Sequence, residues 1–417
     1  MHIKRRDFLG LGAGAATCAA LPMASMSAAP AGGALKSMTT GVKPIGHDEY
    51  LTRLDQARKL MAHLGIGALL LEPGASMVYF TGVHWRRSER LTAAILPRDG
   101  DVAIVTPHFE EPSVRESLMV PSEIRVWNED ENPLEFVAGV LRDRKLRDPL
   151  GIEETVRYFA IDGLMRVMPD VNVMSGAAVA RACRMVKSKT ELALLQKAAD
   201  VTIAAYRHVA PRIQRGMHPA DIGALMAEAH EALGAEHEFA LILLGEASAY
   251  PHGSGKPQAV RPGEVVLMDC GCSVEGYQSD ISRTFVFGEA NEEQRKVWTQ
   301  MREGQRIAIE TARVGVPAGA VDDAVRSQYE KWGYGPGYKL PGTSHRTGHG
   351  IGLDGHEPVN LVHGEVTPLA PGMCFSNEPG IYLPGRFGIR LEDCFYMGEK
   401  EPVWFSKPPD SIDKPFG

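Results

Sequence analysis

The sequence lacks features that would place it in several large classes of proteins. It has no long run of lysine or arginine and a net charge of −7, so neither nucleic acid nor an anionic membrane surface is expected as a partner. Its six cysteines do not show the spacing of a disulfide framework. No Gly-x-Gly-x-x-Gly motif follows an expected strand in the N-terminal half, so no nucleotide site is expected there. With 44% hydrophobic and 23% charged residues, the 417-residue chain is typical of a soluble enzyme with two domains.

The later cysteines are expected to be core residues. Cys270 and Cys272 lie two apart in an expected strand, so their side chains face the same way and cannot bridge each other. A Cys-x-Cys zinc site is the alternative, but no second Cys or His pair follows at finger spacing. Small buried side chains are therefore expected at these two positions and at Cys374 and Cys394.

Residues 1–30 have the composition of a targeting segment. Residues 4–6 are basic, a weakly hydrophobic stretch runs from 11 to 21, and small residues follow from 24 to 29. This pattern resembles a twin-arginine export signal, which implies a periplasmic or exported protein; a disordered basic tail is the alternative. The apolar stretch is too short to span a bilayer, so no membrane association is expected after signal removal. Residues 31–45 are expected to be a flexible lead-in.

Residues 46–172 are expected to form a small α/β domain. Apolar side chains recur at helical spacing from Asp48 to Leu64, and later strands and helices alternate. The other expected elements are strands at 68–71, 77–80, 93–96, 101–106 and 150–152 and helices at 131–142 and 161–168. A polar loop that contains His84 and Arg87 follows one of these strands, and it is either solvated or in contact with substrate.

Residues 173–417 are expected to form a second domain with an internal repeat. Ser188 and Glu191 have capping-box spacing at the start of a long helix. In both halves of the domain a long helix ends at a glycine, Gly216 or Gly315, and a turn with proline then starts a shorter helix. The expected helices are 189–209, 219–233, 291–312 and 320–332. The repeat indicates pseudo-symmetry.

Two acids interrupt an expected β-hairpin. Residues 265–272 and 277–287 are rich in apolar, β-branched and aromatic side chains, and a Glu-Gly turn separates them. Asp269 lies in the first strand and Asp280 in the second. A buried, unpaired carboxylate is costly, so these acids need either a shared metal ion or nearby arginines such as Arg283.

A glycine-rich segment, residues 345–358, contains three histidines. Its glycines prevent a stable helix and allow a close approach of the backbone. His345, His349 and His356 are difficult to explain as core residues in such a loop.

Two glutamates lie at the ends of later expected strands. Glu378 precedes a Pro-Gly turn, and Glu392 shares one strand face with Arg390. Two aspartates, two glutamates and one histidine form an oxygen-rich ligand set that suits manganese, cobalt or iron at least as well as zinc. Four carboxylates match the charge of two divalent ions, which would activate a bridging water and polarise a carbonyl. The sequence therefore predicts a hydrolase, with amide hydrolysis the favoured reaction.

These clusters, in this order, resemble the pita-bread metallopeptidases, the family of methionine aminopeptidase, aminopeptidase P and proline dipeptidase (prolidase), over residues 46–405. The first domain resembles the creatinase-type domain of aminopeptidase P and prolidase, which methionine aminopeptidases lack. The resemblance implies an α/β N-terminal creatinase-like domain, an α+β pita-bread catalytic domain with pseudo-two-fold symmetry, and a homodimer.

The resemblance also implies a metal-binding role for five residues. Asp269 would be a terminal ligand of the first metal, and Asp280 and Glu392 would bridge both metals. His349 and Glu378 would complete the second metal, and Glu378 would also be the general base toward a metal-bridging hydroxide. Manganese is the expected metal.

The remaining matches concern the substrate. His252 would stabilise the transition state, and His356 would contact the scissile carbonyl. His345 would line a proline pocket, and Arg390 would bind a substrate carboxylate or form an active-site ion pair. In a dimer the loop around His84 and Arg87 would reach the neighbouring active site.

Hydrolysis of dipeptides with proline at the second position is the first expectation. The short connection between Glu378 and Glu392 resembles compact bacterial dipeptidases. The alternatives are an Xaa-Pro aminopeptidase, a non-peptide amide hydrolase, a lyase and a non-catalytic binding module of the same fold. Creatinases lack this ligand set, and the lyases carry an extra acid where this chain has Gly271.

Overall fold

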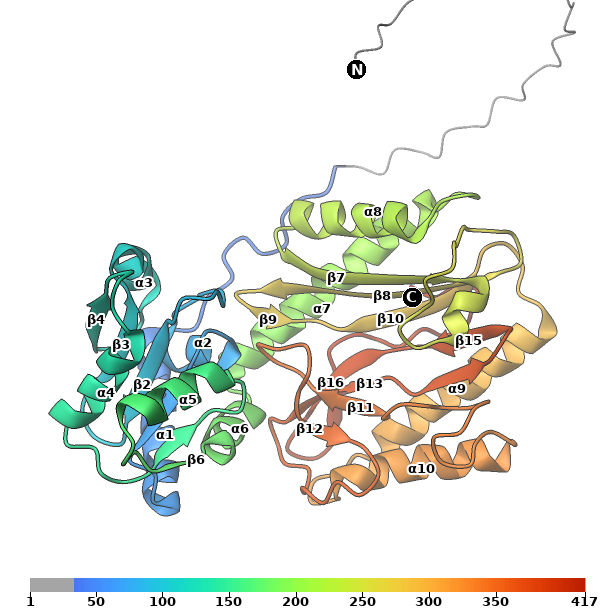
Figure 1. Cartoon of the computed structure of the whole chain (residues 1–417). Helices are drawn as coiled ribbons and strands as arrows, with labels where there is room; N and C mark the ends of the chain where they lie inside the picture. Colours follow the sequence, from blue (N-terminus) through green and yellow to red (C-terminus); the bar gives the residue numbers. More distant parts are fainter. Residues whose placement is uncertain (1–33, 417) are drawn as a thin grey trace, which may run out of the picture. The chain divides into compact units, whose positions relative to one another are not determined.

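The computed structural model describes residues 34–416 (Figure 1). The expected export signal, residues 1–30, lies outside the described residues. Within the described part of the chain, no helix combines the length and the hydropathy that crossing a bilayer requires.

A six-stranded sheet in the order β4-β3-β2-β1-β5-β6 organises the first domain. Its strands are β1 (Ala68–Leu71), β2 (Ala93–Pro97), β3 (Val102–Pro107), β4 (Ser122–Trp127), β5 (Leu150–Ile152) and β6 (Val173–Ser175). The strand β2 runs antiparallel to both of its neighbours, and the other pairs are parallel. The expected α/β class is confirmed. The strand β6 lies just after the predicted domain boundary at residue 172, which stays a prediction.

Six helices accompany this sheet: α1 (His47–Leu64), α2 (Ala75–Thr81), α3 (Glu111–Ser117), α4 (Pro133–Asp143), α5 (Tyr158–Val167) and α6 (Ala177–Met185). The predicted strand at 77–80 is wrong, because these residues lie in α2. Four consecutive apolar residues show no periodicity, so the sequence alone cannot distinguish a buried strand from a buried helix here. The edge strand β4 was not predicted, because polar side chains alternate along it and it has no continuous apolar run.

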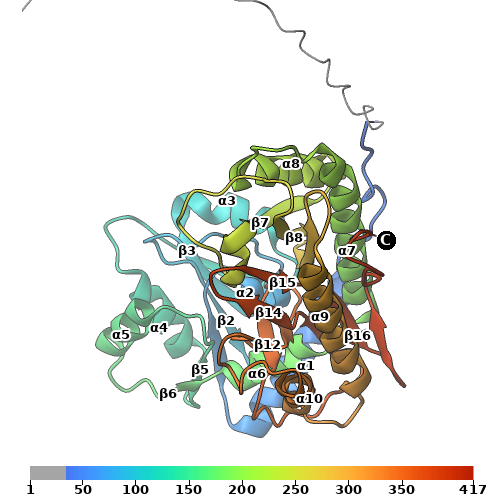
Figure 2. The same ribbon diagram turned by 90° about the vertical axis from the view of Figure 1, so that its right-hand side faces the viewer.

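The second domain is built from two larger sheets, a two-stranded sheet and two helix pairs. In the first half, β7 (Glu236–Leu244), β8 (Val265–Val274), β9 (Tyr277–Gln278) and β10 (Ile281–Val286) form a sheet, and α7 (Lys189–Val209) and α8 (Pro219–Ala232) pack against it. Figures 1 and 2 both show α8 along β7. The Ser188–Glu191 capping box is present at the start of α7.

The second half repeats this plan. The strands β11 (Gly348–Gly350), β12 (Glu357–Leu361), β13 (Cys374–Asn377), β16 (Asp393–Met397) and β17 (Pro402–Trp404) form a sheet, and β14 (Gly380–Leu383) pairs with β15 (Phe387–Arg390). The helices α9 (Glu292–Thr311) and α10 (Ala318–Lys331) cover it. Gly216 and Gly315 have φ angles of 89° and 85° and precede α8 and α10 at corresponding points, as the predicted pseudo-symmetry requires.

Buried polar contacts join the two domains. The Arg53 guanidinium of α1 lies 2.9 Å from the Tyr277 hydroxyl and 3.3 Å from a Glu191 carboxylate oxygen. The Glu357 carboxylate accepts from Arg184 at 2.5 Å and from Lys187 at 2.8 Å. These side chains are almost entirely shielded from solvent, so each charge depends on its partner.

Candidate active site

The hairpin between β8 and β10 brings two acids to one place. Glu275 and Gly276 have φ angles of 51° and 79°, the left-handed pair that a tight hairpin turn requires. The turn sets the register in which Asp269 of β8 lies opposite Ser282 of β10. Asp280 immediately precedes β10 and therefore lies close to Asp269. The four later cysteines are buried, as expected, and two of them, Cys270 and Cys272, lie on either side of Gly271 in β8.

The five predicted metal ligands converge from both halves of the second domain. Three groups of side chains have ligand atoms within 4.8 Å of one another: Asp269, Asp280 and Glu392; His349, Glu378 and Glu392; and Asp280, His349 and His356. Asp280 and Glu392 each take part in two groups, whereas Asp269 and Glu378 each take part in one. This is the arrangement that two bridging and two terminal carboxylates would have.

The unsatisfied oxygens of this cluster match the needs of a divalent cation. Within the described residues, Asp269 Oδ1, Asp280 Oδ1 and Glu392 Oε1 are buried without a hydrogen-bond partner. Burial, and then the neighbouring carboxylates, raise the pKa of Asp280 and of Glu392 well above the usual range. A cation between these groups would reverse both effects and satisfy the orphaned oxygens. The residues therefore fit a divalent-metal centre.

The alternative in which arginines neutralise the acids holds only in part. Arg283 pairs with Asp393 at 2.7 Å, so the suggested pairing with the hairpin acids is wrong. Arg390 does pair with Asp269 Oδ2, at 2.6 Å. Among the ion pairs of the described residues, none joins Asp280 to an arginine.

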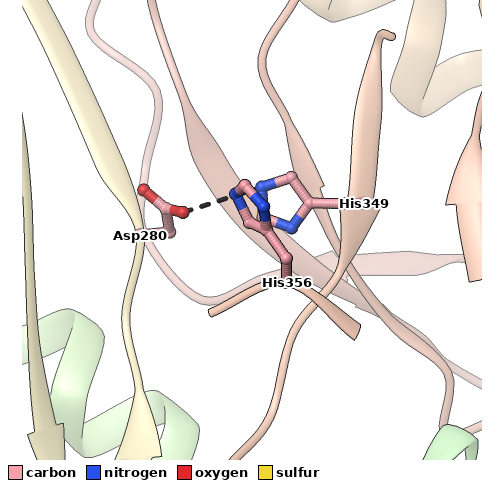
Figure 3. Close-up of side chains that lie close together, drawn as sticks. All are labelled: Asp280, His349 and His356. Atoms are coloured by element: carbon pink, nitrogen blue, oxygen red, sulfur yellow. Dashed lines mark ion pairs between the residues drawn. The ribbon is translucent and has the colours of Figure 1, made fainter. Parts of the chain in front are cut away.

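Histidine rings lie directly beside the acids. His349 Nε2 is 3.2 Å from Glu378 Oε1, 3.6 Å from Asp280 Oδ2 and 3.8 Å from Glu392 Oε1. Figure 3 shows the His349 and His356 rings facing the Asp280 carboxylate, and their centroids are 4.0 Å apart. Burial, followed by the nearby His349 and Arg346, lowers the pKa of His356 to about 4. His356 is therefore a neutral imidazole at pH 7.

A second hydrogen-bond network connects His345, Tyr382 and Arg390 to the acids. His345 Nε2 is 2.7 Å from the Tyr382 hydroxyl, which lies 3.2 Å from Arg390. Arg390 also donates to Ser282 at 3.0 Å, and Ser282 donates to Glu392 at 2.9 Å. Of the two roles predicted for Arg390, the structure contains the active-site ion pair. Burial raises the pKa of Tyr382 to about 12, so its hydroxyl stays protonated.

A cavity of about 520 Å³ collects nine of the predicted site residues. They are His252, Asp269, Asp280, His345, His349, His356, Glu378, Arg390 and Glu392. Within one chain, His84 and Arg87 do not line this cavity. His84 lies beside Gly276, and Arg87 donates to the Pro73 carbonyl at 2.8 Å and to Thr155 at 2.6 Å.

Two side chains at the site, Arg346 and Tyr382, were not among the residues predicted from the sequence. Arg346 lines the cavity and donates to His356 Nδ1 at 3.1 Å. Its position between His345 and His349 was the available signal. Tyr382 links His345 to Arg390, but it lies in an ordinary strand sequence that gives no sign of this contact.

The pseudo-symmetric domain and the buried acid–histidine cluster define a metallopeptidase. Residues 193–399 match the model of Metallopeptidase family M24, and residues 53–186 match that of the Creatinase/Prolidase N-terminal domain. The chain belongs to metallopeptidase family M24 and has the pita-bread fold of its prolidase-type members.

The names of similar proteins refer to two related activities, dipeptidase (or prolidase) and X-Pro aminopeptidase. The probable dipeptidase PepE of Mycobacterium tuberculosis is 32% identical over 377 residues, which cover 89% of this chain and 98% of the relative. The prolidase of Thermococcus sibiricus superposes with a TM-score of 0.80 at 28% identity, covering 86% of this chain and 97% of that structure. The X-Pro aminopeptidase of Thermotoga maritima superposes with a TM-score of 0.76 at 26% identity, covering 86% of this chain and 98% of that structure.

Proposed function

We propose that this metallopeptidase hydrolyses dipeptides with proline at the second position, as a prolidase with two divalent metal ions, most suitably manganese, in each chain. The observation that carries the proposal is that Asp280 and Glu392 lie together in one ligand group and that each also belongs to a second group in the same cavity. The dipeptidase and prolidase names of the relatives above support the substrate class. The compact β14–β15 hairpin is all that separates Glu378 from Glu392, which is consistent with a small substrate.

The five ligands would hold the metal ions, and the surrounding side chains would act on the substrate. Asp269, Asp280, His349, Glu378 and Glu392 are the proposed ligands. When bound, two divalent ions lower the pKa of a water molecule and polarise the scissile carbonyl. Glu378 is the proposed acceptor of the proton from the attacking water, since its carboxylate borders the cavity beside His349.

A neutral His356 is suited to donate a hydrogen bond to the carbonyl oxygen as negative charge develops there. The Arg346 N–H donates to His356 Nδ1, so the proton of the neutral ring lies on Nε2. His252 lines the same cavity from the loop before β8. His345 lines the cavity and is held by the buried Tyr382 hydroxyl, and we propose that His345 borders the pocket for the proline ring. Arg390 does not act on the substrate in this proposal; it orients Asp269 and Tyr382.

The discriminating experiment is hydrolysis of Ala-Pro and Ala-Pro-Ala by the manganese-loaded protein without residues 1–30, with Glu392→Ala as the blank. The proposal predicts cleavage of the dipeptide and little cleavage of the tripeptide. Preferential cleavage of the tripeptide would instead establish an Xaa-Pro aminopeptidase, the activity in the name of one structural relative. Cleavage of neither, with metal bound, would direct attention to non-peptide amides or to lyase chemistry.

The bridging role of Asp280 has its own test. Asp280→Asn should lower the metal content from about two ions per chain to one or fewer, because an amide cannot offer two anionic oxygens to two cations. Metal content would be measured by inductively coupled plasma mass spectrometry after desalting. Asp170→Asn, an exposed substitution of the same kind, is the matched control. An unchanged metal content would contradict the bridging assignment.

Location and assembly are proposals on the sequence pattern alone. We propose export through the twin-arginine route and a homodimer in which His84 and Arg87 approach the partner's cavity. His84 and Arg87 do not line the cavity of their own chain, and in the proposed dimer they would contact substrate in the cavity of the partner chain. Cell fractionation tests the first proposal and light scattering on a size-exclusion column tests the second; a cytoplasmic protein or a monomer would refute them.

A further inference from the structure

Arg346 is held in place by the helix α10. The Asp322 carboxylate of α10 accepts from the Thr347 backbone N–H at 3.0 Å and from its hydroxyl at 2.7 Å. Arg326, paired with Asp322 at 2.6 Å, donates to the Thr343 carbonyl at 3.0 Å and also to the His345 carbonyl. The backbone on both sides of Arg346 is therefore fixed before any substrate binds, which lowers the entropic cost of using its side chain.

The charge of Arg346 is uncompensated, unlike that of the other arginine in the cavity. Arg390 is buried and paired with Asp269. None of the ion pairs formed by the described residues includes Arg346, and its single side-chain hydrogen bond goes to His356, which is not an anion and so cannot compensate the guanidinium charge. Four carboxylates would balance two divalent ions, so the two arginines would leave the cavity positively charged, with Arg390 held against Asp269 and Arg346 without a carboxylate beside it. A half-buried guanidinium without a carboxylate partner favours the binding of an anion.

We infer that Arg346 binds a carboxylate of the substrate. The inference rests on the proposed function and names the group of the peptide that this site recognises. A guanidinium presents several N–H groups in one plane, and a carboxylate can accept from two of them at once. Donation to His356 uses one of these groups and leaves others for the substrate. Because His356 faces the metal ligands, a carboxylate on Arg346 lies next to the reacting bond.

Two parts of a dipeptide could supply this carboxylate. One is the carboxyl terminus, which follows proline directly in a dipeptide and is absent in a longer peptide or an amide. The other is an acidic side chain of the residue before proline. The first source would make Arg346 the reason for dipeptide preference, and the second would make it a determinant of side-chain preference.

The test compares three compounds: Ala-Pro, which has a carboxylate at its C-terminus; Ala-Pro-NH2, which has none; and Glu-Pro-NH2, which has one only in its side chain. The manganese-loaded enzyme is compared with Arg346→Met, which keeps the length of the side chain, and with Arg346→Lys, which keeps the charge but loses the planar fork. Arg215→Met, at an exposed arginine without side-chain partners among the described residues, is the matched control. The same compounds are titrated by calorimetry into Glu378→Gln enzyme with and without Arg346→Met, so that binding is measured without turnover.

If the carboxyl terminus is the ligand, Arg346→Met should lower kcat/KM for Ala-Pro by about 10- to 100-fold, chiefly through KM, and leave Ala-Pro-NH2 unchanged. If the side chain is the ligand, the loss should appear with Glu-Pro-NH2 alone. Arg346→Lys should restore part of either loss. Calorimetry should show the same differences in affinity.

Two results would overturn the inference. An equal loss of kcat with all three compounds would mean that Arg346 only positions His356, and no change with any compound would mean that it is not used. The proposed function can be refuted separately. If binding depends on Arg346 but the wild-type enzyme cleaves none of the three compounds, the carboxylate site is supported and the proposed hydrolase activity is refuted. If none of the three binds, both are refuted.

Discussion

The substitution Glu378→Gln is expected to lower kcat for Ala-Pro by at least about 100-fold, and up to about 10⁴-fold, without changing the unfolding transition of the metal-free protein. Glutamine has nearly the same shape but cannot accept the proton from the attacking water, a contribution of about this size in other enzymes. Its loss as a metal ligand would add to the effect. Steady-state kinetics on the manganese-loaded protein and a circular dichroism melt supply the two measurements.

The control for this experiment is Glu399→Gln, an exposed substitution of the same chemistry in the connection between β16 and β17, which does not line the cavity. Metal content should be measured in parallel, since a loss of both ions would explain the inactivity without a proton-transfer role. Retention of near-wild-type activity with both metal ions bound would show that Glu378 has been assigned wrongly.

The substitution Glu357→Gln is expected to destabilise the fold by about 3–5 kcal/mol, the range for breaking a buried ion pair by removing one partner. Arg184 and Lys187 both depend on this carboxylate, and Glu357 is 4% exposed. An amide would leave the buried Lys187 without its ion-pair partner, and Arg184 would keep only the more exposed Asp354. Urea unfolding at pH 7, with Glu399→Gln as control, measures the difference.

Acid should remove the same interaction in the wild-type protein. Burial opposes ionisation of Glu357, but Lys187 and Arg184 outweigh it and lower its pKa from 4.5 to about 2. A carboxyl whose pKa is lowered on folding stabilises the protein above its unfolded pKa, and this contribution is lost as the pH falls from about 4.5 to 2. The stability difference between wild type and Glu357→Gln should therefore shrink over this range. A difference that stays constant with pH would show that the ion pair is not its source.

The residues of the candidate metal site could be picked out from the sequence because several lie in local patterns that are unusual for their surroundings. Asp269 and Asp280 interrupt apolar strands, and His349 lies in a glycine-rich loop, so each residue stands out without knowledge of the fold. The hairpin turn was also a local signal, and its two left-handed residues confirm it.

The features that sequence reasoning missed depend on distant partners. Arg346 was visible in the sequence, but only the structure shows that Arg390 is paired and Arg346 is not. The contact between Tyr382 and His345 joins residues 37 positions apart. The helix α2 was taken for a strand because four apolar residues in a row satisfy both structures, and the choice between them is made by tertiary packing.

The polar contacts between the domains have a consequence for truncation and domain fusion. Removing residues 34–186 would take away Arg53 and Arg184, while Tyr277, Glu191 and Glu357 would remain in the catalytic portion with much of their charge compensation gone. We therefore expect that the segment matching the M24 family model, residues 193–399, does not fold stably by itself. A fusion protein that contains only the catalytic segment would have uncompensated charge at the edge of the loop that carries His356. We therefore expect this segment to unfold less cooperatively and to be less stable than the full chain.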